Sequence, residues 1–115
     1  LVGSTSDSLD HLAEGTDYLE QGDYENAIGQ FDEAIRLAPK FAKAYNNRGL
    51  AYASLGEYER AIQDLDEVIK LNLNDAQAYY IRGLLYEELG KSDESARNFT
   101  KAKDLGFEGN IHFVD

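Results

Sequence analysis

The chain contains no cysteine, no methionine and no tryptophan, and only one proline among its 115 residues. Without cysteine it can form no disulfide, no thiolate zinc site and no thiol nucleophile. No apolar run approaches the roughly 20 residues that a membrane-spanning helix needs, and no basic-then-apolar signal segment opens the chain. We therefore expect a soluble chain, with the cytoplasm favoured as its compartment. Because it starts at Leu1 and lacks methionine, we expect its native start to be missing, as in a processed chain or a fragment.

Basic residues are also scarce, since 11 Lys and Arg stand against 22 Asp and Glu, for a net charge of −11. Phosphate backbones and anionic membranes are bound mainly through Lys and Arg, so we expect neither nucleic acid nor a membrane as a partner. The acid is concentrated at one end, because residues 8–41 carry eight acidic groups and only two basic ones. A ligand with a basic flank should place that flank near this end.

The spacing of the glycines indicates an internal repeat. Gly15, Gly49 and Gly83 are each 34 residues apart, and a second series follows at the same interval. The same period relates four further series of residues: Tyr18, Tyr52 and Tyr86; Phe31, Leu65 and Phe99; Ala34, Val68 and Ala102; and Leu37, Leu71 and Leu105. Apolar residues within each repeat recur with a period near 3.6, which indicates helices. The pattern predicts helices over 8–20, 24–37, 42–54, 58–70, 76–88 and 92–104.

Two glycines of the second repeat have specific expected roles. Gly49 should face Ala61, so that the two helix backbones of the repeat approach closely. Gly56 falls in the connecting turn, where a left-handed residue is needed. Each repeat is therefore expected to be a helical hairpin.

The pattern Tyr-x2-Arg-Gly-x2-Tyr, followed by Gly, Ala, Phe or Leu, and Ala, resembles the tetratricopeptide repeat family over residues 8–109. The resemblance implies an all-α, right-handed α-solenoid of three antiparallel helix pairs, whose first helices line a concave groove. It divides the single domain into a lead segment, three repeats and a tail: 1–7, 8–41, 42–75, 76–109 and 110–115. Departures from the family pattern are His11 for the first aromatic, Leu73 and Phe107 where Pro39 ends the first repeat, and Ser95 for the alanine.

We expect no enzyme, cofactor or metal site. His11 and His112 are 101 residues apart, and no nucleophile with a matching base is visible. The acidic pairs lack the alternating oxygen ligands and central glycine of a calcium loop. The glycines follow the 34-residue repeat and match no phosphate-binding pattern.

Function is expected to lie in the groove, whose wall consists of the helix positions outside the inward-facing stripe. Its predicted ligand residues are Leu12, Thr16, Lys43, Asn46, Asn47, Leu50, Tyr80, Ile81 and Leu84. Large apolar side chains on an exposed face mark partner sites, and the two asparagine amides can pair with a peptide backbone. We therefore predict a non-catalytic scaffold that binds a peptide or protein segment with apolar side chains and a basic flank.

Two alternatives remain open at this point. The same surfaces could hold copies of the chain together, as a structural self-assembly module that forms a homo-oligomer. The chain could also be a helper segment of a larger enzyme.

One branch of the family holds acidic chaperone tails through a five-residue carboxylate clamp. Its positions fall on Leu12, Thr16, Asn47, Gln77 and Ile81 in this sequence. Only Asn47 matches the clamp, so we expect that such tails are not the ligand. The net negative charge adds repulsion.

Arg48 and Arg82 stand before the packed glycines, where many family members have leucine. We expect structural pairing, with Asp64 holding both guanidinium groups across the repeat junction. After Leu105 the apolar tail residues Ile111, Phe113 and Val114 are expected either to cap the last helix or to dock onto a second copy.

Overall fold

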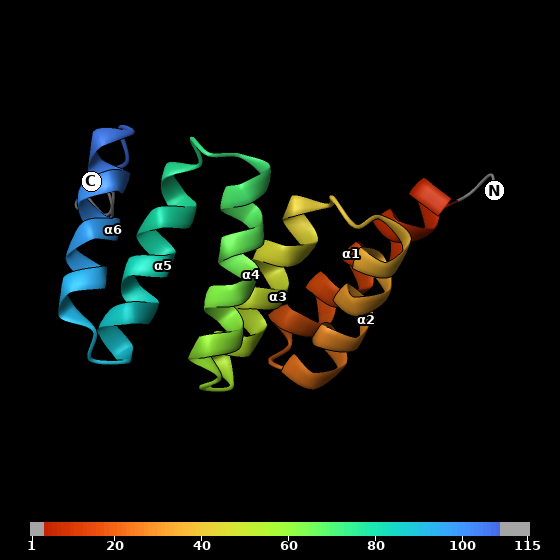
Figure 1. Ribbon diagram of the computed structural model, residues 1–115. Coiled ribbons are helices and arrows are strands. Elements are labelled where there is room, and N and C mark those ends of the chain that lie inside the picture. Colours follow the sequence, from red (N-terminus) through yellow and green to blue (C-terminus); the bar gives the residue numbers. More distant parts are fainter. Residues whose placement is uncertain (1–3, 109–115) are drawn as a thin grey trace, which may run out of the picture.

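The computed structural model describes residues 4–108, which form an elongated array of helices measuring 43 × 31 × 26 Å (Figure 1). The helices are α1 (Ser4–Glu20), α2 (Tyr24–Leu37), α3 (Ala42–Ser54), α4 (Tyr58–Leu71), α5 (Ala76–Glu88) and α6 (Ser92–Asp104). Successive helices run in opposite directions and pack as three pairs, one for each repeat. The fold is therefore an all-α solenoid, as the sequence predicts.

The helix boundaries follow the predicted periodicity closely. The bounds of α2, α3, α5 and α6 are those expected, and α4 ends one residue later, at Leu71. The difference is at the start of the chain, where α1 begins at Ser4 and not at residue 8. Asp7 then lies in the first turn, where a carboxylate interacts favourably with the helix dipole. Part of the expected lead segment is thus the first turn of α1.

The turn within each repeat is made by a glycine in the left-handed conformation. Gly56 has φ +80°, and Gly22 and Gly90 have φ +79° and +74°. The N–H of Glu57, just after Gly56, donates to the carbonyl of Tyr52 at 2.9 Å, which closes the C-terminus of α3. The expected role of Gly56 is confirmed.

The two helices of a repeat approach closely at a glycine of the first helix. A Cβ atom at Gly49 would lie 2.9 Å from Leu65 Cδ2 and 3.4 Å from the carbonyl oxygen of Ala61. These distances confirm that Gly49 faces Ala61 and that a larger residue would force α3 and α4 apart.

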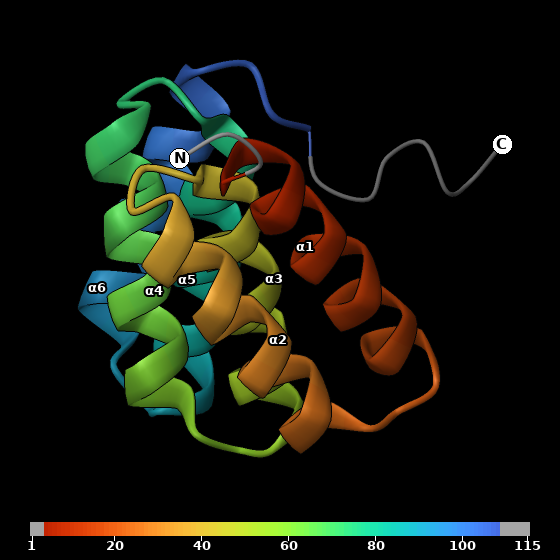
Figure 2. The same cartoon turned by 90° about the vertical axis from the view of Figure 1, so that its right-hand side faces the viewer.

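The helices form two layers. Viewed along the array, α1, α3 and α5 lie on one side and α2, α4 and α6 on the other (Figure 2). Each helix packs against the next one in sequence, and α1 also touches α3. The central core cluster comes from α4 and α5 and contains Ala61, Ile62, Leu65, Val68, Ile69, Ala78 and Leu85. The core therefore lies between the layers and leaves the outer face of α1, α3 and α5 free to line a site.

Candidate functional site

A hollow of about 430 Å³ lies between α1 and α3, on the face that the first helices of the repeats share. We call it the α1–α3 hollow; it is lined by Leu9, Leu12, Ala13, Thr16, Asp17, Lys43, Asn46 and Asn47. Five of these, Leu12, Thr16, Lys43, Asn46 and Asn47, are groove residues predicted from the sequence. The structure therefore brings the N-terminal half of the predicted groove together around one concave surface.

The polar side chains of this hollow form a short chain of hydrogen bonds. Asn46 Nδ2 donates to Asn47 Oδ1 at 3.4 Å, and Asn47 Nδ2 donates to Thr16 Oγ1 at 3.3 Å. Thr16 Oγ1 in turn donates to the carbonyl of Leu12 at 2.8 Å. The bond between Asn47 and Thr16 links α3 to α1. Asn46 Oδ1 has no hydrogen-bond partner within residues 4–108. That oxygen can accept a bond from an incoming peptide N–H.

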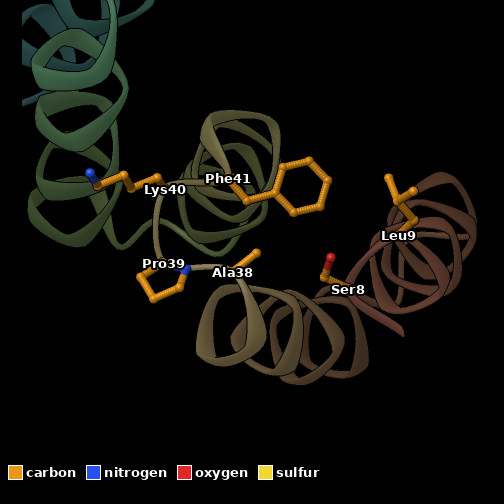
Figure 3. A pocket seen from close by; sticks show the side chains of 6 residues that line it. All are labelled: Ser8, Leu9, Ala38, Pro39, Lys40 and Phe41. Atoms are coloured by element: carbon orange, nitrogen blue, oxygen red, sulfur yellow. The ribbon is translucent and has the colours of Figure 1, made fainter. Parts of the chain in front are cut away.

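A second hollow, of about 530 Å³, adjoins the first through Leu9. We call it the Phe41 hollow; it is lined by Ser8, Leu9, Ala38, Pro39, Lys40 and Phe41. The ring of Phe41 points toward Leu9 across the opening, whereas Lys40 points away from it (Figure 3). Leu9 is 51% exposed. The wall is therefore apolar and accessible.

The C-terminal half of the predicted groove has a different character. Leu50 and Ile81 are half-buried, and Leu84 is 37% exposed. The ring of Tyr80 packs against Phe99 and Phe107, with centroid distances of 5.4 and 4.7 Å. The Tyr80 ring therefore packs against residues at the C-terminal end of the array. The tail residues 110–115 lie outside those that the structure describes, so both alternatives for them, capping the last helix or docking onto a second copy, stay predictions.

Arg48 ties α3 to both neighbouring helices. Its Nη2 and Nε donate to the two carboxylate oxygens of Asp64, on α4, at 2.7 and 2.9 Å. Its Nη1 donates to Asp32, on α2, at 2.9 Å. The Asp64 side chain is only 4% exposed and the Asp32 side chain 51%. Asp64 is thus the buried partner of the guanidinium group, and Asp32 is the partner across the repeat junction.

The expectation that Asp64 also holds Arg82 is wrong. Arg82 Nε donates to Asn98 Oδ1 on α6 at 2.8 Å, and its Nη1 donates to Asp66 on α4 at 2.8 Å. Asp64 and Asp66 are two residues apart and thus about 200° apart around α4, so they face different neighbours. The two arginines share no carboxylate. Arg48 and Arg82 instead repeat one arrangement, in which each contacts the residue 16 positions before it and the residue 16 positions after it.

Burial and the pairing with Arg48 shift the pKa of Asp64 in opposite directions. Removal from water raises the pKa of the Asp64 carboxyl, and the hydrogen bonds and positive charge of Arg48 lower it in part. The same hydrogen bonds raise the pKa of Arg48. The pair is a structural ion pair that faces away from the α1–α3 hollow, because Asp64 and Arg48 line a separate surface with Tyr45, Gln63 and Asp66.

His11, one of the two histidines noted in the sequence, lies in the first repeat. His11 Nδ1 lies 2.7 Å from Gln30 Oε1, a contact that joins α1 to α2 within the first repeat. No group of three or more His, Asp or Glu side chains in this part of the chain is arranged to hold a metal ion. Nor is any of the helices described there both long and apolar enough to cross a bilayer.

Comparison with known families identifies the repeat. The model of the tetratricopeptide repeat family matches residues 12–71 and 55–106, which together cover most of the chain. The protein therefore belongs to the tetratricopeptide repeat family. A comparison with curated protein sequences finds no match.

Three solved structures show how closely the fold is shared. A crystal structure of MamA is 30% identical with a TM-score of 0.85, and the match covers 89% of this chain but 59% of that one. The TPR domain of Arabidopsis OM64 is 26% identical with a TM-score of 0.89, over 97% of this chain and 93% of that one. The second TPR domain of Spaghetti (RPAP3), solved bound to an HSP90 peptide, is 27% identical with a TM-score of 0.83, over 88% and 94%.

Proposed function

We propose that this protein is a non-catalytic interaction scaffold that binds a peptide or protein segment along the exposed face of α1, α3 and α5. The observation that carries the proposal is the α1–α3 hollow, in which apolar and amide side chains from two repeats line one concavity. Apolar anchors with a few amide groups are typical of grooves that take extended or helical segments. The Spaghetti domain, which shares the fold, was solved with a peptide bound.

The proposed ligand has apolar side chains and a basic flank. The exposed acids Glu14 and Asp17 line a hollow of about 230 Å³ at the C-terminal part of α1, and neither forms an ion pair within residues 4–108. Free carboxylates at this place favour a lysine or arginine on the ligand. An acidic tail is a poor ligand by the same reasoning, because Leu12, Gln77 and Ile81 supply no positive charge where the carboxylate clamp of related domains needs it.

We expect Leu50→Glu and Leu84→Glu each to weaken binding at least tenfold, since a carboxylate would replace apolar contact on the proposed face. The probes are peptides selected on the wild-type protein from a random display library. Their dissociation constants are measured by fluorescence anisotropy, after circular dichroism has shown that each variant is folded.

The matched control is Leu71→Glu, because Leu71 is 39% exposed, close to the 37% of Leu84, but ends α4 in the other layer. It should leave the dissociation constants unchanged. If Leu71→Glu weakens binding as much as Leu50→Glu does, or if neither groove variant has an effect, the proposed face is not the ligand site.

A further inference from the structure

Three hollows follow one another along α1 and are joined by shared residues. The Phe41 hollow shares Leu9 with the α1–α3 hollow, and that hollow shares Asp17 with the one lined by Glu14, Asp17, Tyr18 and Gln21. From the N-terminal to the C-terminal part of α1 their walls change from apolar, through mixed apolar and polar, to acidic. The series is a continuous surface with a different chemistry at each end.

The side of α1 that carries Asp10 and Asp17 is unsuited to the packing of another helix. Asp10 and Asp17 stand one 34-residue period before Ala44 and Ala51, which are both fully buried in α3. In α1 the corresponding positions are carboxylates, and both are exposed. A helix stacked against them would bury unpaired charge, which costs far more than the contact gains. This side of α1 is therefore built to face water and cationic groups, and a second copy of this acidic chain is the wrong occupant.

We propose, on the basis of the function proposed above, that this surface takes an extended peptide with one bulky apolar side chain in the Phe41 hollow and a lysine or arginine beside Glu14 and Asp17. Leu9 and Asp17 are eight residues apart, which is about 12 Å along a helix. An extended peptide covers that length in about four residues. The two recognition elements of the ligand are therefore spaced about four positions apart.

The middle of the surface fits the backbone of such a peptide. Asn46 Oδ1 is an acceptor without a partner within residues 4–108, and Lys43 forms no ion pair there. Both lie between the two ends, in the α1–α3 hollow. The chain's own residues 109–115 match only the apolar end, because they contain no lysine or arginine.

The test uses four capped peptides in a Gly-Ser background, measured by 15N chemical-shift titration of the full chain. The first has Phe and Arg four positions apart, the second has them adjacent, the third has Ser for Phe and the fourth has Glu for Arg. The first should bind at least fivefold more tightly than each of the others. Its affinity should also fall as salt is raised, because the acidic end is exposed.

Substitutions in the protein test which end of the surface binds which side chain of the peptide. Leu9→Ser should weaken the Phe–Arg peptide about tenfold and leave the Ser–Arg peptide unchanged, since the apolar wall is lost. Glu14→Gln combined with Asp17→Asn should weaken it about threefold at low salt and abolish the salt dependence. The matched controls are Leu73→Ser, at a leucine 67% exposed outside these hollows, and Glu59→Gln, at an exposed acid of α4. Neither control should alter the affinity.

The outcomes separate this inference from the general function. If the Phe–Arg peptide binds but Leu9→Ser does not weaken it, or if the adjacent-residue peptide binds equally well, the two-ended arrangement is wrong while groove binding stands. Binding that appears only after removal of residues 109–115 would make the tail the occupant and overturn the proposal. If none of the four peptides shifts any α1 or α3 resonance at millimolar concentration, the proposal is also overturned, and the display experiment decides the general function by itself.

Discussion

Arg48→Ala is expected to lower the free energy of unfolding by about 3 kcal/mol at neutral pH. The substitution leaves the Asp64 carboxylate, 4% exposed, without the guanidinium group that donates two hydrogen bonds to it. The effect is measured by urea unfolding followed by circular dichroism. Arg36→Ala is the control, because Arg36 and Glu33 form an exposed pair within one helix and the loss of that pair should leave the unfolding midpoint nearly unchanged.

The pH dependence of the same variant tests the cause. Burial holds the folded pKa of Asp64 above its unfolded value, so protonation of this carboxyl favours the folded state. Its stabilising contribution is full below the unfolded pKa and is lost as the pH rises through the folded pKa. Arg48 lowers the pKa of Asp64, so the loss of Arg48 raises that pKa further. The deficit of Arg48→Ala should therefore shrink as the pH is lowered from neutral into the acidic range, where the Asp64 carboxyl becomes protonated.

Two further variants discriminate between a buried charge and a simple loss of contacts. Arg48→Ala combined with Asp64→Ala should be more stable than Arg48→Ala alone, because no unpaired carboxylate remains. Arg82→Ala should cost only about 1–2 kcal/mol, since its buried partner Asn98 is neutral. A double variant less stable than the single one, or an Arg82 effect larger than that of Arg48, would contradict the buried-charge explanation.

Gly15→Ala is expected to destabilise the protein by about 1–3 kcal/mol. A Cβ atom at Gly15 would lie 2.5 Å from Cε1 and 2.7 Å from Cδ1 of Phe31. Phe31 is fully buried, so a shift of its ring would disturb the packing around it. The helices α1 and α2 would have to separate around the core of the first repeat. The midpoint of urea unfolding measures the effect.

The control for this variant is the same substitution where space is free. Gly29→Ala lies inside α2 with no atom within 4 Å of the added methyl group, and should stabilise the protein by about 0.5–1 kcal/mol. A double-mutant cycle with Phe31→Leu supplies the second check, because Leu65 occupies the corresponding place in the second repeat. The two substitutions should be less harmful together than their sum. If Gly15→Ala and Gly29→Ala have the same effect, steric contact with Phe31 is not the reason that glycine stands at position 15.

The sequence predicted the helices well because the 34-residue period and the helical period reinforce each other. Apolar residues at helical spacing, with Gly56 at the turn, locate α3 and α4 to within one residue. The start of α1 was missed because Ser4–Asp7 carries no apolar stripe and its helical state depends on continuation from residue 8 onward. The helical period also explains why five predicted groove residues line one hollow, because helix register alone decides which side chains share a face.

The partners of Arg82 were predicted wrongly because nearness in the sequence does not show which face of α4 an aspartate occupies. Asp32 and Asp66 are one period apart, as are Asp64 and Asn98, so the partners 16 residues before and after each arginine were visible in the repeat. The Phe41 hollow could not be predicted in this way. It depends on how the loop between α2 and α3 places Ala38 and Phe41 against α1, and that path follows from tertiary packing, for which a single sequence has no periodic signal.

The packing of each helix on its sequence neighbour has a consequence for the speed of folding. The helix pairs that touch extensively are successive in the chain, so a contact closes a loop of a few tens of residues at most. Proteins dominated by such local contacts fold in microseconds to milliseconds, whereas distant strand pairings slow folding by orders of magnitude. Any one hairpin can form first and the next can then add to it. The chain therefore has several short routes to the native array, and its folding does not wait for the two termini to meet.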